Sequence, residues 1–167
     1  FSISSGTRFF EQAHIKDVSA WLKLVSNPAD ELAFKRLVLM LPGVGPKAAE
    51  KLWTAFGLAR QAAAGGDMVA AISAPVAPAL MAIARDVPKK AQVAWAGLAT
   101  TVSQLEAPEV LGRAGEMIRI VLEAFYEEYA ARCGCTCLRM DTNARNIGAR
   151  RLYKHLGFRE AGIVPCV

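Results

Sequence analysis

The residues best suited to chemistry lie in one short stretch of glycines, prolines and lysines between two apolar segments. Residues 41–52 read Leu-Pro-Gly-Val-Gly-Pro-Lys-Ala-Ala-Glu-Lys-Leu. An apolar run ends at Pro42, and we expect Gly43 and Gly45 to form a turn that needs unusual backbone angles and close approach. Pro46 suits the first position of a new helix. The pattern predicts a helix–hairpin–helix element.

The backbone of such a turn can bind an anion. Amides at the turn, together with the positive end of the helix dipole, form a binding site for an anion. A nucleic-acid phosphate is the anion that we expect there, so DNA would be contacted by its backbone rather than by its base sequence. A plain helical corner, in which the glycines serve only the bend, stays open as an alternative. The candidate DNA-binding residues are Gly43, Val44, Gly45 and Lys47, with Lys51 and Arg36 as weaker candidates.

The composition is that of a folded protein. The chain has 167 residues, of which 53% are hydrophobic and 21% charged, enough for one domain or one domain with an appendage. No stretch reaches the ~18 apolar residues of a membrane helix, and the N-terminus has no pattern of a secretory signal. It also lacks a starting Met, which suggests a fragment or a processed chain. We expect a cytoplasmic protein with no membrane partner.

The net charge of +5 is unevenly distributed. Residues 1–132 carry 14 basic and 13 acidic side chains, whereas residues 133–167 carry six basic and two acidic ones. The larger part is therefore not a basic mass, and any DNA contact there must be local. One such anion-binding site neutralises only one or two phosphates, so we expect weak DNA binding with a mild salt dependence.

The cysteines do not have the spacing of a metal site. Three of the four alternate as Cys-x-Cys-x-Cys, unlike the Cys-x₂-Cys pairs of structural zinc sites, and the chain has only two histidines. We expect buried, reduced thiols and no metal. The four residues are Cys133, Cys135, Cys137 and Cys166.

Apolar residues recur at helical spacing through most of the chain. After a short N-terminal strand, this predicts an all-α array of about seven helices up to residue 132, with short connections and a linker over 61–66. The expected helices cover about 15–26, 30–41, 46–58, 68–73, a short segment around 80–83, 88–105 and 108–132.

The pattern changes near Cys133. Residues 135–141 and 158–164 read as strands, and the helix between them is capped by Thr142-Asn143 and ended by Gly157. The fold class we predict is therefore mostly α, with a small β-α-β unit at the C-terminus. The predicted domains are 1–132 and 133–167.

Several motifs in the larger part match one family. They are Gly6-Thr7-Arg8-Phe9-Phe10-Glu11, Trp21-Leu22-Lys23-Leu24, Asn27-Pro28-Ala29-Asp30 and Pro42-Gly43-Val44-Gly45. With these, residues 1–132 resemble the 2B subdomain region of a superfamily 1A DNA helicase of the UvrD/Rep/PcrA kind. Ser5 departs from the family, which has a glycine there. The resemblance implies a mostly helical subdomain in which Gly43-Val44-Gly45 takes the place of the family's Gly-Ile-Gly element, which contacts the duplex ahead of the fork.

The same resemblance implies partners and cofactors outside this chain. Duplex or fork DNA and the rest of the helicase motor would be the partners. No Gly-x₄-Gly-Lys-Ser/Thr loop occurs in the sequence, so the chain itself cannot hydrolyse ATP by the motor mechanism. ATP and Mg would bind elsewhere in a helicase parent.

A second resemblance concerns the tail. Leu138-Arg139-Met140-Asp141-Thr142-Asn143, Asn146, Ala149, Leu152-Tyr153 and Gly157-Phe158 resemble the C-terminal part of a GNAT N-acetyltransferase. This implies acetyl-CoA as the cofactor, with Asn146 near it and Tyr153 as the acid that protonates the departing thiolate. The family's pyrophosphate loop is matched only at Gly115, and the adjacent Glu116 would repel a phosphate. A structural role for the tail is therefore the better interpretation.

The leading interpretation is a non-catalytic DNA-binding module of a helicase. Two alternatives stay open: a fragment of an acetyl-CoA-dependent N-acetyltransferase, and a chimaera, natural or engineered, that binds no ligand. Unpaired strands in the tail could pair between two chains, so a homodimer is also an expectation.

Overall fold

The computed structural model describes residues 13–127, 147–155 and 159. The described residues are mostly helical and none of them lies in a strand, so the prediction of a mostly α protein is confirmed for this part. The chain divides into two compact units, Phe1–Ala124 and Phe125–Val167. Apart from Arg159, which is described and lies in no strand, the predicted strands lie outside the described residues, as do the four cysteines and Asn146.

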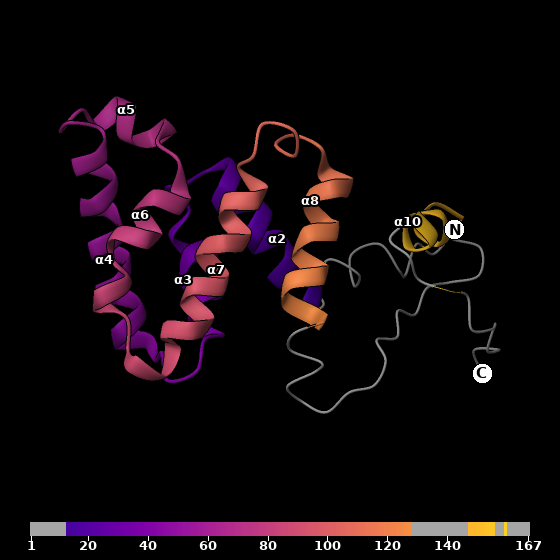
Figure 1. Ribbon diagram of the computed structural model, residues 1–167, viewed down its shortest axis with the longest axis horizontal. Helices are drawn as coiled ribbons and strands as arrows, with labels where there is room; N and C mark the ends of the chain where they lie inside the picture. The colour runs from indigo at the N-terminus through magenta and orange to yellow at the C-terminus, as the bar shows by residue number, and fades with distance from the viewer. Residues whose placement is uncertain (1–12, 128–146, 156–158, 160–167) are drawn as a thin grey trace, which may run out of the picture. The chain divides into compact units, whose positions relative to one another are not determined.

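The first unit is a body of packed helices (Figure 1). Helix α3 packs against α2 and α4, while α7 packs against α6 and α8, and α2 contacts both α7 and α8. Helix α10 belongs to the second unit. The elements are α2 (Ala13–Ser26), α3 (Glu31–Leu39), α4 (Pro46–Ala63), α5 (Met68–Ser73), α6 (Val76–Ala82), the 3₁₀ turns η1 (Ala84–Asp86) and η2 (Lys89–Ala91), α7 (Gln92–Leu105), α8 (Ala114–Val121), the π-helical segment η3 (Leu122–Glu127) and α10 (Ile147–His155).

An aromatic cluster forms the centre of the helical body. Phe34 of α3 is fully buried and stacks on Phe56 of α4, with 4.8 Å between the ring centroids. Trp95 of α7 meets Phe34 edge-on at 6.5 Å, and its Nε1–H donates a hydrogen bond of 3.0 Å to the carbonyl of Leu80. Aromatic pairs of this geometry stabilise by about 0.5–1.5 kcal/mol beyond the area that they bury. The cluster therefore fixes α3, α4 and α7 relative to one another.

Local capping explains why several helix ends could be predicted. Asp30 precedes α3, and its carboxylate accepts the amide of Ala33 at 2.9 Å. Asp67 caps α5 in the same way, accepting the amide of Val69 at 2.8 Å. Short acidic side chains at this position satisfy amides that a helix start leaves unpaired. The predicted helices over 15–26, 30–41 and 68–73 are confirmed within two residues at each end.

Several helix bounds predicted from the sequence are wrong. The segment expected around 80–83 is α6, which begins at Val76, and the helix expected from 88 begins as α7 only at Gln92, after η2. Helix α4 continues to Ala63, into the expected linker, because alanines favour the helix until Gly65 and Gly66, both at positive φ, end it. The helix expected from residue 108 begins only at Ala114, because turns that include Gly112 at φ +82° precede it. Proline alone was thus a poor marker of that helix start.

The described part contains neither a membrane-spanning helix nor a metal site. No helix there is long and apolar enough to cross a membrane. No cluster of His, Cys, Asp and Glu side chains within it could hold a metal ion.

Candidate nucleic-acid interface

A tight turn joins α3 to α4. The amide of Val44 donates to the carbonyl of Leu41 at 3.2 Å, and Gly43 between them has φ +78°. Proline at the second position and a positive-φ glycine at the third are the sequence of a type II turn, which Pro42 and Gly43 provide. The side chains of Leu41 and Val44 are both buried. The turn is therefore anchored to the core at its first and last residues, while Pro42 and Gly43 are exposed.

Gly45 has a different role from the one its sequence suggested. The expectation of unusual backbone angles is wrong for it, because φ is −98° and ψ is 177°, an extended conformation that any residue adopts. Gly45 is the N-cap of α4 and provides no side-chain hydrogen bond to it. A Cβ added there would meet nothing within 4 Å. The missing side chain thus relieves no crowding within the protein, but it leaves the start of α4 uncovered.

The start of α4 offers unpaired amides. Pro46 has no N–H, and the amide of Ala49 donates to Gly45 at 2.9 Å. Within the described part of the chain, no hydrogen bond takes up the amides of Lys47 and Ala48. The amide of Val44, in contrast, is used by the turn itself. These unpaired donors stand at the positive end of an 18-residue helix, which favours an anion.

The two lysines predicted on α4 lie beside these donors. Lys47 and Lys51 are both exposed and stand one helical turn apart, on the same side of α4. The acid between them, Glu50, is paired with Lys35 of α3, which also contacts Glu31 at 2.5 Å. Hydrogen bonds to Glu31 and Glu50 raise the pKa of Lys35, so this lysine is charged at neutral pH. The acid nearest the candidate lysines is therefore held by a partner on the neighbouring helix.

Arg36 is engaged elsewhere. Its Nε and Nη2 atoms each lie 2.7 Å from Oδ1 of Asp17 on α2. A guanidinium paired in this way holds α3 to α2. It is less available to a ligand than Lys47.

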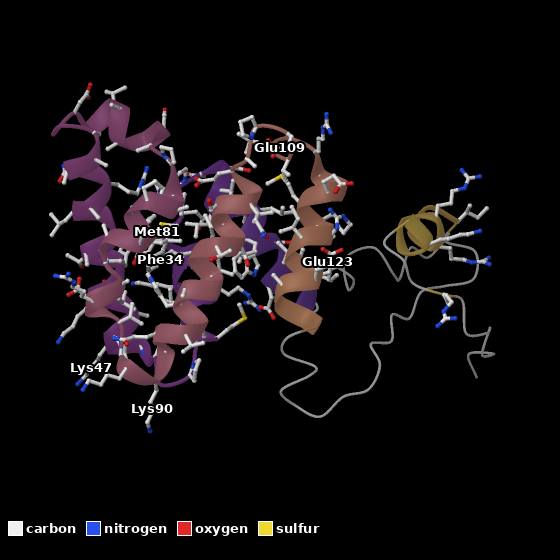
Figure 2. All side chains as sticks on the ribbon, in the orientation of Figure 1. Phe34, Lys47, Met81, Lys90, Glu109 and Glu123 are labelled. Atoms are coloured by element: carbon white, nitrogen blue, oxygen red, sulfur yellow. The ribbon has the colours of Figure 1, made fainter. Side chains whose placement is uncertain are left out.

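The structure brings a further lysine to the turn that local sequence patterns did not single out. A Cβ placed on Gly43 would lie 3.4 Å from Cβ of Lys90 and 3.7 Å from its Cδ. Lys90 belongs to η2, far from Gly43 in the sequence, so only tertiary packing brings the two together. Figure 2 shows Lys47 and Lys90 at the same end of the helical body.

The residues that the second resemblance singled out are placed only in part. Tyr153 lies within α10, which confirms a helix in this part of the tail. Asn146 and, apart from Arg159, both predicted strands are outside the described residues.

Comparisons with known proteins bear on the helical part. A segment of 53 residues is 43% identical to the ATP-dependent DNA helicase PcrA of Bacillus subtilis, and covers 31% of this chain and 7% of that protein. Over 53 residues the chain is also 42% identical to the ATP-dependent DNA helicases Rep of Salmonella typhimurium and Escherichia coli. Part of this chain is similar to bacterial DNA helicases.

The helicase-like segment is short. It spans less than a tenth of the length of each of these helicases. No protein-family model matches the chain, and no solved structure does. The resemblance of the tail to an acetyltransferase finds no support in these comparisons.

Proposed function

We infer that this chain is a non-catalytic DNA-binding module of a superfamily 1A-type helicase, and that the turn between α3 and α4 contacts a backbone phosphate of duplex DNA. The similarity to PcrA and Rep supplies the class of protein. The observation that carries the contact is the uncovered start of α4, with a glycine N-cap, unpaired amides and an exposed Lys47.

Each part of this arrangement has a role toward a phosphate. The amides of Lys47 and Ala48 donate hydrogen bonds to its oxygens, and the helix dipole adds favourable charge. Gly45 lets the phosphate approach the backbone closely because no side chain stands in the way. Lys47 adds a full positive charge, Lys51 adds one a turn further along, and Arg36 remains a weaker contributor because Asp17 holds it.

In this proposal, the ATP-hydrolysing motor belongs to a longer helicase that contains this chain. ATP, Mg and the motor domains are partners of the parent protein, since this sequence has no phosphate-binding loop for ATP. The role of the chain is then to hold duplex DNA near the fork. No observation favours the acetyl-CoA alternative or the ligand-free chimaera.

The test is a fluorescence-anisotropy titration of a labelled duplex with a single-stranded overhang at two salt concentrations. The intact chain is compared with Lys47→Glu, and far-ultraviolet circular dichroism checks that both are folded. We expect salt-sensitive binding by the intact chain and at least a tenfold loss in the variant, since a phosphate contact is replaced by repulsion. Absence of binding by the intact chain at low salt would contradict the proposal.

A further inference from the structure

The turn at Gly43 lies beside a second basic segment, the 3₁₀ turn η2. Its Lys89 and Lys90 are both exposed, whereas the flanking Val87 and Ala91 are buried. The amide of Ala91 donates to the carbonyl of Pro88 at 2.7 Å, which closes the turn. The two lysines therefore project from a short element that is fixed on both sides by core residues.

The 3₁₀ turn η2 lies against the α3–α4 turn at Gly43. The aliphatic stem of Lys90 runs past Gly43, close enough that a Cβ on the glycine would be 3.4 Å from it. Lysine stems commonly lie on a surface in this way while the ammonium group stays in water. Lys90 thus lies beside the turn that leads into the unpaired amides of α4, at the same end of the helical body as Lys47 (Figure 2).

The lysines of the two segments are available to a ligand. Among the described residues, none of Lys47, Lys51, Lys89 and Lys90 takes part in an ion pair. Four unpaired ammonium groups that repel one another are unfavourable in the free protein, and an anionic partner relieves this repulsion. Since the whole region 1–132 carries 14 basic and 13 acidic residues, this concentration of charge is local.

We propose that η2 is a second phosphate-binding segment, and that Lys90, supported by Lys89, contacts a backbone phosphate of the duplex next to the one held at the start of α4. This rests on the proposed function, because the α4 site must bind DNA for η2 to extend it. The two segments together form a clamp that reads the spacing of phosphates along a duplex. The number of phosphates neutralised then rises from one or two to about two or three.

The salt dependence of binding measures this number. The logarithm of the association constant falls with the logarithm of salt concentration with a slope of roughly −0.9 for each phosphate neutralised. We expect a slope of about −2 to −3 for the intact chain. The double variant Lys89→Gln/Lys90→Gln should have a slope about 1 smaller in magnitude and about tenfold weaker binding at low salt.

A matched control removes the same charge elsewhere. Lys16→Gln/Lys23→Gln changes two exposed lysines of α2, which contributes to neither the turn nor η2. The full chain, both double variants and Lys47→Gln are titrated with the same labelled duplex at four salt concentrations. Thermal unfolding is followed for each. The expected result is that the control keeps the slope of the intact chain while the η2 variant does not.

The outcomes separate the two proposals. If the intact chain binds and Lys47→Gln weakens binding, but the η2 variant behaves like the control, the α4 site stands and the role of η2 is overturned. If the intact chain does not bind the duplex at low salt, both are overturned. If the control lowers the slope as much as the η2 variant, overall charge explains binding and the clamp is overturned.

Discussion

Replacing Gly45 with serine should make the protein more stable and its DNA binding weaker. Gly45 already has the extended backbone of an N-cap, with φ −98° and ψ 177°. A serine in this conformation accepts the amide of Lys47 or Ala48 through its hydroxyl oxygen. The same amides are the ones that we propose for the phosphate. The substitution therefore satisfies within the protein the donors that a ligand would otherwise use.

The expected gain in stability is small but measurable. A serine N-cap stabilises by a few tenths of a kcal/mol relative to glycine, and removing a glycine from the unfolded chain adds about 0.4–1 kcal/mol. No clash opposes this, since a Cβ at position 45 meets nothing within 4 Å. We expect the free energy of unfolding to rise by about 0.5–1 kcal/mol, which raises Tm by roughly 2–3 °C in a chain of this size.

The expected loss in binding follows from the same atoms. A hydrogen bond to a charged group contributes about 1.5–3 kcal/mol, so losing one weakens binding by roughly ten- to a hundredfold in Kd. Thermal unfolding and anisotropy titration with a tailed duplex measure the two effects on the same samples. Gly45→Ala is the control, because it also narrows the approach and removes the same glycine from the unfolded chain but cannot cap the helix. It should weaken binding and should have a lower Tm than Gly45→Ser.

Two results would refute the reasoning. If Gly45→Ser raises Tm and binds the duplex as tightly as the intact chain, the amides of α4 are not the phosphate donors. If it does not raise Tm, the start of α4 is not the uncapped helix end that the structure shows.

Two further substitutions test the surroundings of this site, and a third tests a helix cap elsewhere in the helical body. Gly43→Ala should lower the free energy of unfolding by about 1–2 kcal/mol in a denaturant titration, since φ is +78°, a conformation that an L side chain rarely adopts; equal stability would contradict the turn geometry. Glu50→Gln should strengthen binding about twofold in the anisotropy assay, because it removes the carboxylate nearest the α4 lysines; weaker binding would contradict that placement. Glu106→Ala should lower the free energy of unfolding by about 1–2 kcal/mol, because its carboxylate accepts two amides at the start of α6 at 2.5 and 3.0 Å; an unchanged Tm would exclude this cap.

The helices of the larger part could be predicted where their signals are local. Asp30 and Asp67 are N-caps followed at once by helical residues, and Asn27-Pro28 ends α2, so these bounds follow from neighbouring residues. The extent of α4 and the start of α8 could not be predicted in this way. Alanine-rich sequence suits both a helix and a linker, and what decides is the packing around it and the glycines at positive φ.

The candidate site could likewise be predicted only in part from the sequence. The turn, its positive-φ Gly43 and the first turn of α4 follow from a stretch of about ten residues, and their sequence predicted the position of each. The role of Gly45 as an N-cap could not be predicted from its residue type, because glycine adopts both positive-φ conformations and the ordinary extended conformation of an N-cap. Lys90 could not be found from any local pattern, because its place beside Gly43 is a product of tertiary packing.

The same packing decides whether the two basic segments act together. Phe34 of α3 stacks on Phe56 of α4 and meets Trp95 of α7 edge-on, and η2 directly precedes α7. One buried cluster therefore carries the helices on both sides of the turn as well as the helix that η2 leads into. Because close-packed cores deform little, the spacing between Lys90 and the start of α4 is set before a ligand arrives. Two segments held in this way lose little backbone conformational entropy on binding, so even a few phosphate contacts can hold a duplex.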